Sequence, residues 1–176
     1  YWAMPHKWRN WLLLIASYYF YMCWNALYAI LIIFTTISTW KLATMMNGKS
    51  PKIRKILLSL SVTPNLSILF NFKYYDLADL TNLLSIQIVP VKLGLLLPVG
   101  ISFYTFQAIG YSIDVYRRDI KSENNLGVFA LFISFFPQLV AGPIERASHL
   151  LPQFKEQKSF SYENFRNGLM IILFGF

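Results

Sequence analysis

Charged residues are scarce in this sequence, and cysteine and histidine are nearly absent. Of 176 residues, 14% are charged, whereas 56% are hydrophobic and 18% are aromatic. A soluble domain has about 25% charged residues, so this composition indicates a membrane protein. The single cysteine, Cys23, excludes an internal disulfide framework and a cysteine-based zinc site. We expect Cys23 to pack in a core or to face lipid, because free cysteine is among the most buried residue types.

Several motifs of soluble enzymes and secreted proteins are also missing. The sequence has no G-x-S-x-G nucleophile elbow and no glycine-rich phosphate loop. No secretory signal peptide is visible, because no small-residue cleavage site follows the first basic residues. The chain starts at Tyr1 and ends inside an apolar run, so we expect it to be a fragment of a longer protein.

The net charge of +8 comes from basic residues that lie between apolar blocks. In a soluble protein such a charge would indicate nucleic acid binding. Here the positions of the basic residues are typical of membrane topology signals and of contact with anionic headgroups. We therefore expect membrane lipid as a partner, and no nucleic acid.

Apolar blocks follow one another along the chain, and we interpret residues 1–176 as one all-α membrane domain, a polytopic bundle of transmembrane helices. As one helix, 11–40 would be about 45 Å long, which exceeds the roughly 30 Å hydrocarbon core, so we predict two helices with a turn near 23–25. The predicted spans cover about 11–23, 25–40, 56–72, 93–116 and 126–144, and another begins at 165–176. We expect Pro64 to kink the third span. We interpret 41–55 as a basic loop, 76–92 as an interfacial segment and 145–166 as polar surface.

The distribution of lysine and arginine predicts the orientation of the spans. If every block crosses once, residues 1–10, 41–55 and 117–125 share one side and carry ten of the 16 basic residues. If 126–144 instead enters and returns, the split becomes fourteen to two. The sharper asymmetry favours a broken or re-entrant segment, with the richer side in the cytoplasm. This segment contains Pro137 and the pair Gly142-Pro143, which interrupt a helix.

A polar stripe precedes the broken segment. At about 100° per residue, one narrow helix face carries Gly100, Tyr104, Gln107, Tyr111 and Asp114. A carboxylate at the bilayer centre costs about 2.5–3.5 kcal/mol, so we expect Asp114 to face water, a partner or the interface. Arg117 and Arg118 follow it at i+3 and i+4 and are close enough to pair with it. The stripe is either an inward polar face or the lining of a substrate path.

Two stretches, PVGISFYTFQAIGYSIDVYRR and ALFISFFPQLVAGPIERASHLLPQF, resemble the membrane-bound O-acyltransferase family. The similarity is greatest to the branch of the alginate O-acetyltransferase membrane subunit, and SYYFYMCWN and NLSILFNFKYYD also resemble that branch. The resemblance implies a multi-pass protein of the cell inner membrane that moves an acetyl or other acyl group from a cytoplasmic donor to an exported polysaccharide such as alginate. It implies acetyl-CoA or another acyl donor as substrate, no permanently bound cofactor, no metal site, and an extracytoplasmic partner protein.

The resemblance also places the catalytic histidine beyond Phe176, so we expect no catalytic residue in this chain and no acetylation by the chain alone. The candidate residues of the substrate channel are Tyr104, Gln107, Tyr111, Asp114, Gln138, Gly142 and Pro143. The candidate residues for the donor phosphates are Arg117, Arg118 and Arg146, although lipid headgroups and topology also account for such basic residues.

Two alternatives stay open from the residues themselves. His149 could act as a general base, but it lies in a polar stretch with no carboxylate placed to complete a triad, so we interpret it as a loop or interfacial histidine, and His6 likewise. A transporter or channel subunit would also use broken helices and a polar stripe. Against transport, the spans carry few ionisable residues, of which Asp114 is the main one.

Overall fold

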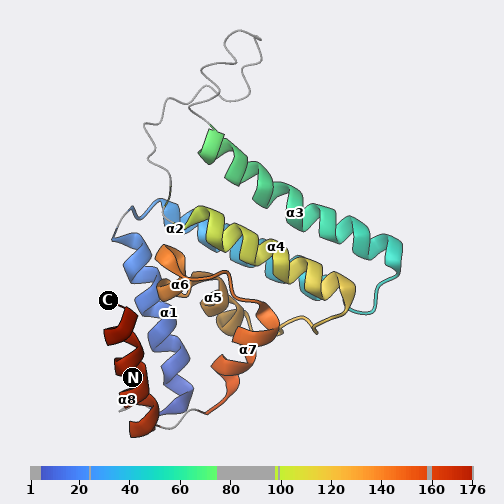
Figure 1. Cartoon of the computed structure of the whole chain (residues 1–176). Coiled ribbons are helices and arrows are strands. Elements are labelled where there is room, and N and C mark those ends of the chain that lie inside the picture. The colour runs from blue at the N-terminus through green and yellow to red at the C-terminus, as the bar shows by residue number, and fades with distance from the viewer. Residues whose placement is uncertain (1–4, 24, 75–97, 99, 158–159, 176) are drawn as a thin grey trace.

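The computed structural model describes residues 5–23, 25–74, 98, 100–157 and 160–175, and within these ranges it is all-helical (Figure 1). The all-α prediction is therefore confirmed. The helices are α1 (His6–Met22), α2 (Tyr28–Met45), α3 (Pro51–Tyr74), α4 (Ile101–Arg117), α5 (Leu126–Ser134), α6 (Phe136–Ala141), α7 (Ala147–Lys155) and α8 (Tyr162–Gly175).

The first long apolar block forms two helices, as predicted. Helix α1 ends at Met22, and α2 begins at Tyr28 after a turn in which the Asn25 side chain accepts a hydrogen bond from the Leu27 amide at 2.9 Å. Cys23 caps α1 and is exposed, so it does not pack in a core. Over Tyr28–Met45 and Pro51–Lys73, α2 and α3 are long and apolar enough to cross a membrane.

The predicted basic loop at 41–55 is mostly helical. Helix α2 continues to Met45, and α3 begins at Pro51, so a short connection with Gly48 at a φ of 68° joins them. Proline suits the first position of a helix, because its missing N–H has no partner there. Helix α3 also continues through Pro64, which we expected to kink it.

Helices α2, α3 and α4 lie side by side, and α4 packs against both of the others and against α5 (Figure 1). Aromatic side chains fill the interface between α4 and α5, where the Tyr111 and Phe129 ring centroids are 4.6 Å apart and those of Phe129 and Phe132 are 6.0 Å apart. All three rings are buried. Such aromatic pairs stabilise a core beyond the area that they bury.

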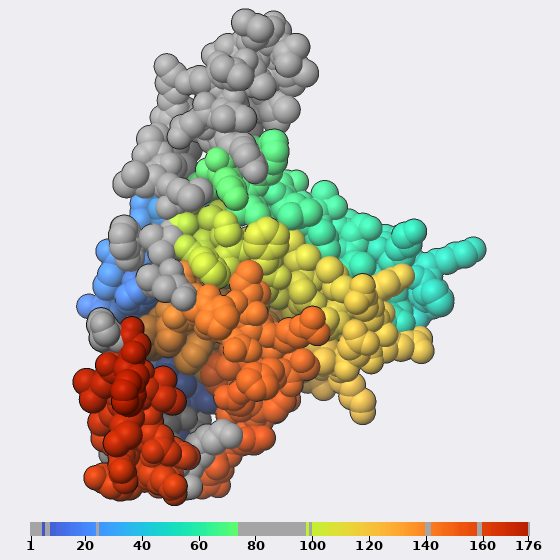
Figure 2. Space-filling view, viewed as in Figure 1, coloured from blue at the N-terminus to red at the C-terminus, as the bar shows by residue number. Residues whose placement is uncertain are grey.

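The later part of the chain departs from the predicted boundaries. Of the span predicted at 93–116, the structure describes the helix from Ile101 onward; residues 93–97 and the interfacial segment at 76–92 lie outside the described residues. The stretch 145–166, predicted to be polar surface, contains the amphipathic helix α7. Its buried residues follow the helical repeat and pack toward α5: Ala147, Leu150, Leu151 and Phe154. Helix α8 buries no residue and stands at the edge of the molecule (Figure 2).

Candidate functional site: the broken segment α5–α6–α7

The apolar block at 126–144 is broken after Ser134, just before a proline. Pro137 has no N–H to donate to the Ile133 carbonyl, and its ring would clash with that carbonyl in a continuous helix. Helix α5 therefore ends at Ser134, and Phe135 takes a non-helical ψ of 104°. Helix α6 begins at Phe136, which leaves Pro137 in its first turn, where an N–H is not needed. The predicted break is confirmed.

A second break follows at Gly142, where α6 ends. Gly142 is extended, with φ −81° and ψ 158°, which is the conformation that a residue before proline prefers. Because Gly142 has no side chain, its backbone can pack closely against Gln138 of α6. A Cβ on Gly142 would lie 2.7 Å from the Gln138 Cα atom. The Gly142-Pro143 pair thus both turns the backbone and lets it approach α6.

Two buried polar side chains bind the backbone groups that the first break sets free. The Gln107 side chain of α4 donates to the Phe132 carbonyl at 3.0 Å. The Ser17 hydroxyl of α1 accepts a hydrogen bond from the Phe136 amide at 3.3 Å. Both side chains are buried. Backbone that is not helical is tolerated at membrane depth only where protein or a polar cavity satisfies it, and here Gln107 and Ser17 do so.

The same glutamine links the break to the rest of α6. Gln107 also lies 3.4 Å from the Gln138 side-chain oxygen, and the Gln138 amide donates to the Pro143 carbonyl at 3.3 Å. On the other side of α6, a Cβ on Gly100 would lie 2.7 Å from the Leu139 carbonyl oxygen. Gly100 has a φ of 75°, a conformation that favours glycine. Helix α6 is therefore seated closely on the start of α4.

After the two breaks the chain returns to the end of the bundle where α5 began. The Lys155 ammonium at the end of α7 pairs with the carboxylate of Glu123, which lies in the loop before α5. The Asn10 side chain near the start of α1 donates to the Phe154 carbonyl at 2.8 Å. In the space-filling view, the surface of α7 adjoins that of the loop after α4 (Figure 2). The segment α5–α6–α7 is therefore re-entrant in the fold.

The loop at 118–125 is fixed by side chains from several elements. The Trp40 indole donates to the Glu123 carbonyl at 2.8 Å, and the Asn47 amide donates to the Ser122 hydroxyl at 2.6 Å. The Tyr111 hydroxyl accepts from the Glu123 amide at 2.8 Å. The start of α1, the α2–α3 connection, this loop and the end of α7 thus lie at one end of the bundle. We call this end of the bundle the basic end, because it carries Lys49, Lys52, Arg117, Arg118, Lys121 and Lys155.

The polar stripe of α4 is largely a packing face. Tyr104, Gln107 and Tyr111 are 0%, 6% and 1% exposed, and the Tyr104 ring meets Tyr21 of α1 edge-on. Asp114 is partly exposed. That these residues line a substrate channel stays a prediction. In the structure, Gln107 binds the backbone at the break after α5, and Tyr111 binds the loop at 118–125.

The candidate donor-binding arginines lie at helix ends. Arg117 and Arg118 are exposed at the end of α4, and Arg146 is exposed as the N-cap of α7, at the opposite end of that helix from Lys155. Although their spacing would allow it, neither Arg117 nor Arg118 forms an ion pair with Asp114 in the described structure.

Helix α4 ends with its terminal carbonyls bonded in two ways. Arg118 has a φ of 70°, and the Asp119 and Arg118 amides donate to the Asp114 and Val115 carbonyls at 3.0 and 3.1 Å, which is the Schellman pattern of helix ends. Arg54, which no sequence pattern marks as important, also binds the end of α4. This buried side chain of α3 donates to the Val115 carbonyl at 3.1 Å and also to the Tyr116 carbonyl. A positive charge at a helix C-terminus is favourable.

His149 is a surface residue of α7. Its ring nitrogen lies 3.2 Å from the Glu145 carboxylate, and the His149 side chain is 69% exposed. This i,i+4 pair is typical of a solvated helix face. Among the described residues, no group of three or more histidine, cysteine, aspartate or glutamate side chains is placed to hold a metal ion.

The re-entrant geometry coincides with a clear relationship in sequence. The whole chain aligns with probable alginate O-acetylases of Pseudomonas aeruginosa and Azotobacter vinelandii at 36% and 35% identity. A peptidoglycan O-acetyltransferase of Helicobacter pylori is 38% identical over 93% of the chain. Along its whole length, this chain is a relative of the bacterial O-acetylases. The resemblance inferred from the broken segment is therefore confirmed.

The chain spans about a third of the length of these O-acetylase relatives: 35%, 36% and 36% of the three proteins. No model of a protein family matches the chain, and no solved structure matches it. The relatives' names specify acetylation of two different polysaccharides. The all-helical fold with two membrane-length apolar helices is consistent with a membrane-embedded part of such an O-acetylase.

Proposed function

We propose that this chain forms part of a membrane O-acetyltransferase that moves an acetyl group from a cytoplasmic donor to hydroxyls of an exported polysaccharide. The similarity of the whole chain to proteins named for acetylating alginate and peptidoglycan carries this proposal. The two acceptors share a chemistry, since both are polysaccharides with free hydroxyl groups. The acceptor class is therefore a polysaccharide hydroxyl, with alginate as the first substrate to test.

The re-entrant segment supports the proposal because such a reaction needs a protein-lined route between the two sides of the membrane. Irregular backbone in a membrane either packs in protein or lines a cavity. Gln138 and Gly142 are partly exposed and Pro143 is exposed, so this side of the segment is free to face a substrate path. Gln107 and Ser17 hold the first break of the segment in protein.

The basic end supports a cytoplasmic donor. Arg117 and Arg118 are exposed there, and guanidinium groups bind phosphate oxygens in a bidentate manner. We propose acetyl-CoA, or another acyl donor that carries phosphates, as the substrate that these arginines attract. The net charge of +8 would also raise the local concentration of an anionic donor.

Transfer to a hydroxyl needs a general base near the acceptor. His149 does not fit this role, because its side chain is 69% exposed on the surface of α7. As the family resemblance implies, we propose that a histidine outside residues 1–176 is this general base. An extracytoplasmic partner that presents or accepts the acetylated group completes the proposed system.

The test measures transfer of labelled acetyl from acetyl-CoA to alginate in membranes of cells that express the gene encoding this chain. Arg118→Gln should raise the KM for the donor about tenfold, which corresponds to one lost charge-assisted contact of about 1.4 kcal/mol. Lys52→Gln, which removes another exposed positive charge at the same end, should leave the KM within twofold. Membranes that carry the protein but transport a solute without acetylating any polysaccharide would contradict the proposal and favour a transporter.

A further inference from the structure

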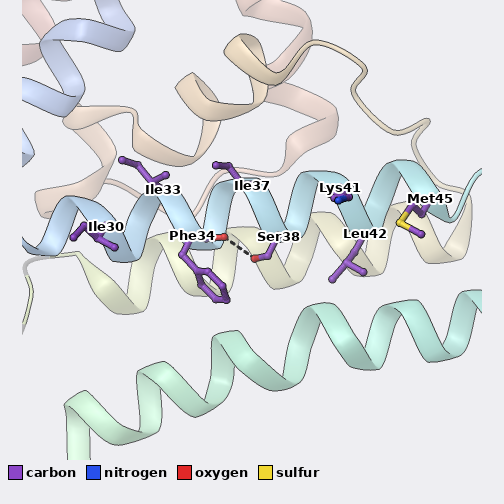
Figure 3. Close-up of a pocket in the computed structure, with 8 residues that line it drawn as sticks. All are labelled: Ile30, Ile33, Phe34, Ile37, Ser38, Lys41, Leu42 and Met45. Carbon is purple, nitrogen blue, oxygen red and sulfur yellow. Dashed lines mark hydrogen bonds between the residues drawn. The ribbon is translucent and has the colours of Figure 1, made fainter.

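One face of α2 carries a row of apolar side chains that stays open along the helix. Five of these side chains, Ile30, Ile33, Phe34, Ile37 and Met45, share one broad face of the helix, and Leu42 lies at the edge of that face. Five of them are 40–63% exposed, and Leu42 is partly buried. Together they line a hollow with a volume of about 600 Å³ (Figure 3).

The hollow offers a ligand almost no polar contact. Its two polar side chains are Ser38 and Lys41. The Ser38 hydroxyl already donates to the Phe34 carbonyl at 2.7 Å (Figure 3), so it needs no further partner. Lys41 is exposed and makes no ion pair within the part of the chain that the structure describes. The complementary ligand is therefore apolar along its length and negatively charged at one end.

A second hollow lies beside the first and shares two of its residues. It has a volume of about 350 Å³ and is bounded by α1, α2 and α5, with Ile33 and Ile37 common to both hollows. Its Thr36 hydroxyl bonds to the Ile32 carbonyl at 2.7 Å, so this polar group is also satisfied. Two adjacent apolar hollows match the two acyl chains of a phospholipid.

The position of Lys41 fits a headgroup. Eleven residues separate Ile30 from Lys41, which is about 16 Å along a helix, close to half of the roughly 30 Å hydrocarbon core. Lys41 lies toward the end of α2 where Asn47 bonds the loop at 118–125, so it is at the basic end. Trp11, which borders the second hollow, is 55% exposed near the start of α1, and tryptophan is enriched at the membrane interface.

We propose that these two hollows bind one anionic phospholipid from the leaflet at the basic end. Its acyl chains lie along the apolar face of α2, one in each hollow, and its phosphate pairs with the Lys41 ammonium. Anionic lipids concentrate in the cytoplasmic leaflet, and the positive-inside rule assigns the basic end to that leaflet. The site is separate from the broken segment and adds a structural lipid to the proposed enzyme.

Native mass spectrometry of the purified protein tests this site after incubation with phosphatidylglycerol or with phosphatidylcholine of the same acyl chains. One phosphatidylglycerol should stay bound, and phosphatidylcholine should be lost more readily. Lys41→Gln should weaken retention of phosphatidylglycerol about fivefold, the effect of one basic residue at an anionic surface. Lys52→Gln, an exposed lysine of α3 outside both hollows, is the matched control and should retain the lipid.

Ile37→Trp places a larger side chain in the wall that the hollows share, and it should reduce retention of both lipids while the protein stays folded, because Ile37 is 48% exposed. Equal retention of phosphatidylglycerol by the wild type and Lys41→Gln would overturn the proposal. So would a dimer in which a second copy covers this face of α2. Acetyl transfer is not the readout, so a failure here leaves the proposed function standing.

Discussion

The Lys155 ammonium pairs with the buried Glu123 carboxylate and thereby ties the end of α7 to the loop that precedes α5. The two residues are 32 positions apart, yet the broken segment brings them together. Glu123 also accepts a hydrogen bond from the Asn125 amide at 3.0 Å. This contact closes the re-entrant segment at the basic end.

Removing the lysine of this pair should destabilise the protein. Lys155→Ala leaves the buried Glu123 carboxylate with one partner fewer, and a hydrogen bond to a charged group contributes about 1.5–3 kcal/mol. We expect a lower midpoint in thermal unfolding in detergent. The double variant Glu123→Gln with Lys155→Ala should recover part of the loss, because it removes the unpaired charge. Additive effects of the two single substitutions would contradict the pairing.

Gln107 should be needed for the break between α5 and α6. Gln107→Leu leaves the Phe132 carbonyl without its side-chain donor, and an unsatisfied buried group costs about 1–3 kcal/mol. Gln153→Leu is the matched control, since Gln153 is exposed on α7 and should change stability by less than about 0.5 kcal/mol. Both values come from denaturant unfolding monitored by tryptophan fluorescence. Equal effects at the two positions would exclude the role given to Gln107.

Two glycines should respond to alanine in opposite directions. A Cβ on Gly142 would meet the Gln138 backbone, so Gly142→Ala should destabilise by about 1–3 kcal/mol through overpacking. A Cβ on Gly110, within α4, has no heavy atom within 4 Å, so Gly110→Ala should stabilise by about 1 kcal/mol through helix propensity. Unfolding midpoints measured side by side give the sign of each change. A neutral Gly142→Ala would contradict the close approach of the turn to α6.

Arg118 should show opposite effects on stability and on donor binding. Its φ of 70° strains a residue other than glycine by about 1–2 kcal/mol, so Arg118→Gly should raise the unfolding midpoint. The same substitution removes a proposed phosphate contact and should raise the KM for acetyl-CoA with little change in kcat. If KM stays constant while stability rises, Arg118 serves the helix end and not the donor.

Composition and proline chemistry predicted much of this fold. Low charge and long apolar blocks indicated a membrane helix bundle, and the turn after α1 followed from a block too long for one crossing. The breaks followed from the missing N–H groups of Pro137 and Pro143. The lysine and arginine count favoured a return within 126–144, whereas in the structure the chain returns only through α7, whose end at Lys155 contacts Glu123.

Other features could not be predicted because they depend on contacts between distant residues. The Arg54 side chain reaches carbonyls more than 60 positions away, and nothing near it in sequence marks that role. The amphipathic pattern of α7 is short and is interrupted by Pro152, so its polar residues obscured its buried face. Helical periodicity predicts that the polar stripe of α4 lies on one face. Whether that face packs against another helix or lines a substrate path depends on which distant segment lies opposite it.

The side of the membrane on which α7 ends tests the central claim most directly. Single cysteines at Lys49, Lys121 and Gln153, each exposed, are introduced into a Cys23→Ser background and labelled with a membrane-impermeant maleimide in intact cells and in inverted vesicles. In the wild-type protein, which keeps Cys23, this exposed cysteine at the turn after α1 reports the opposite side. The re-entrant fold predicts that Gln153→Cys reacts from the same side as Lys49→Cys and Lys121→Cys. Labelling of Gln153→Cys from the side of Cys23 would contradict it.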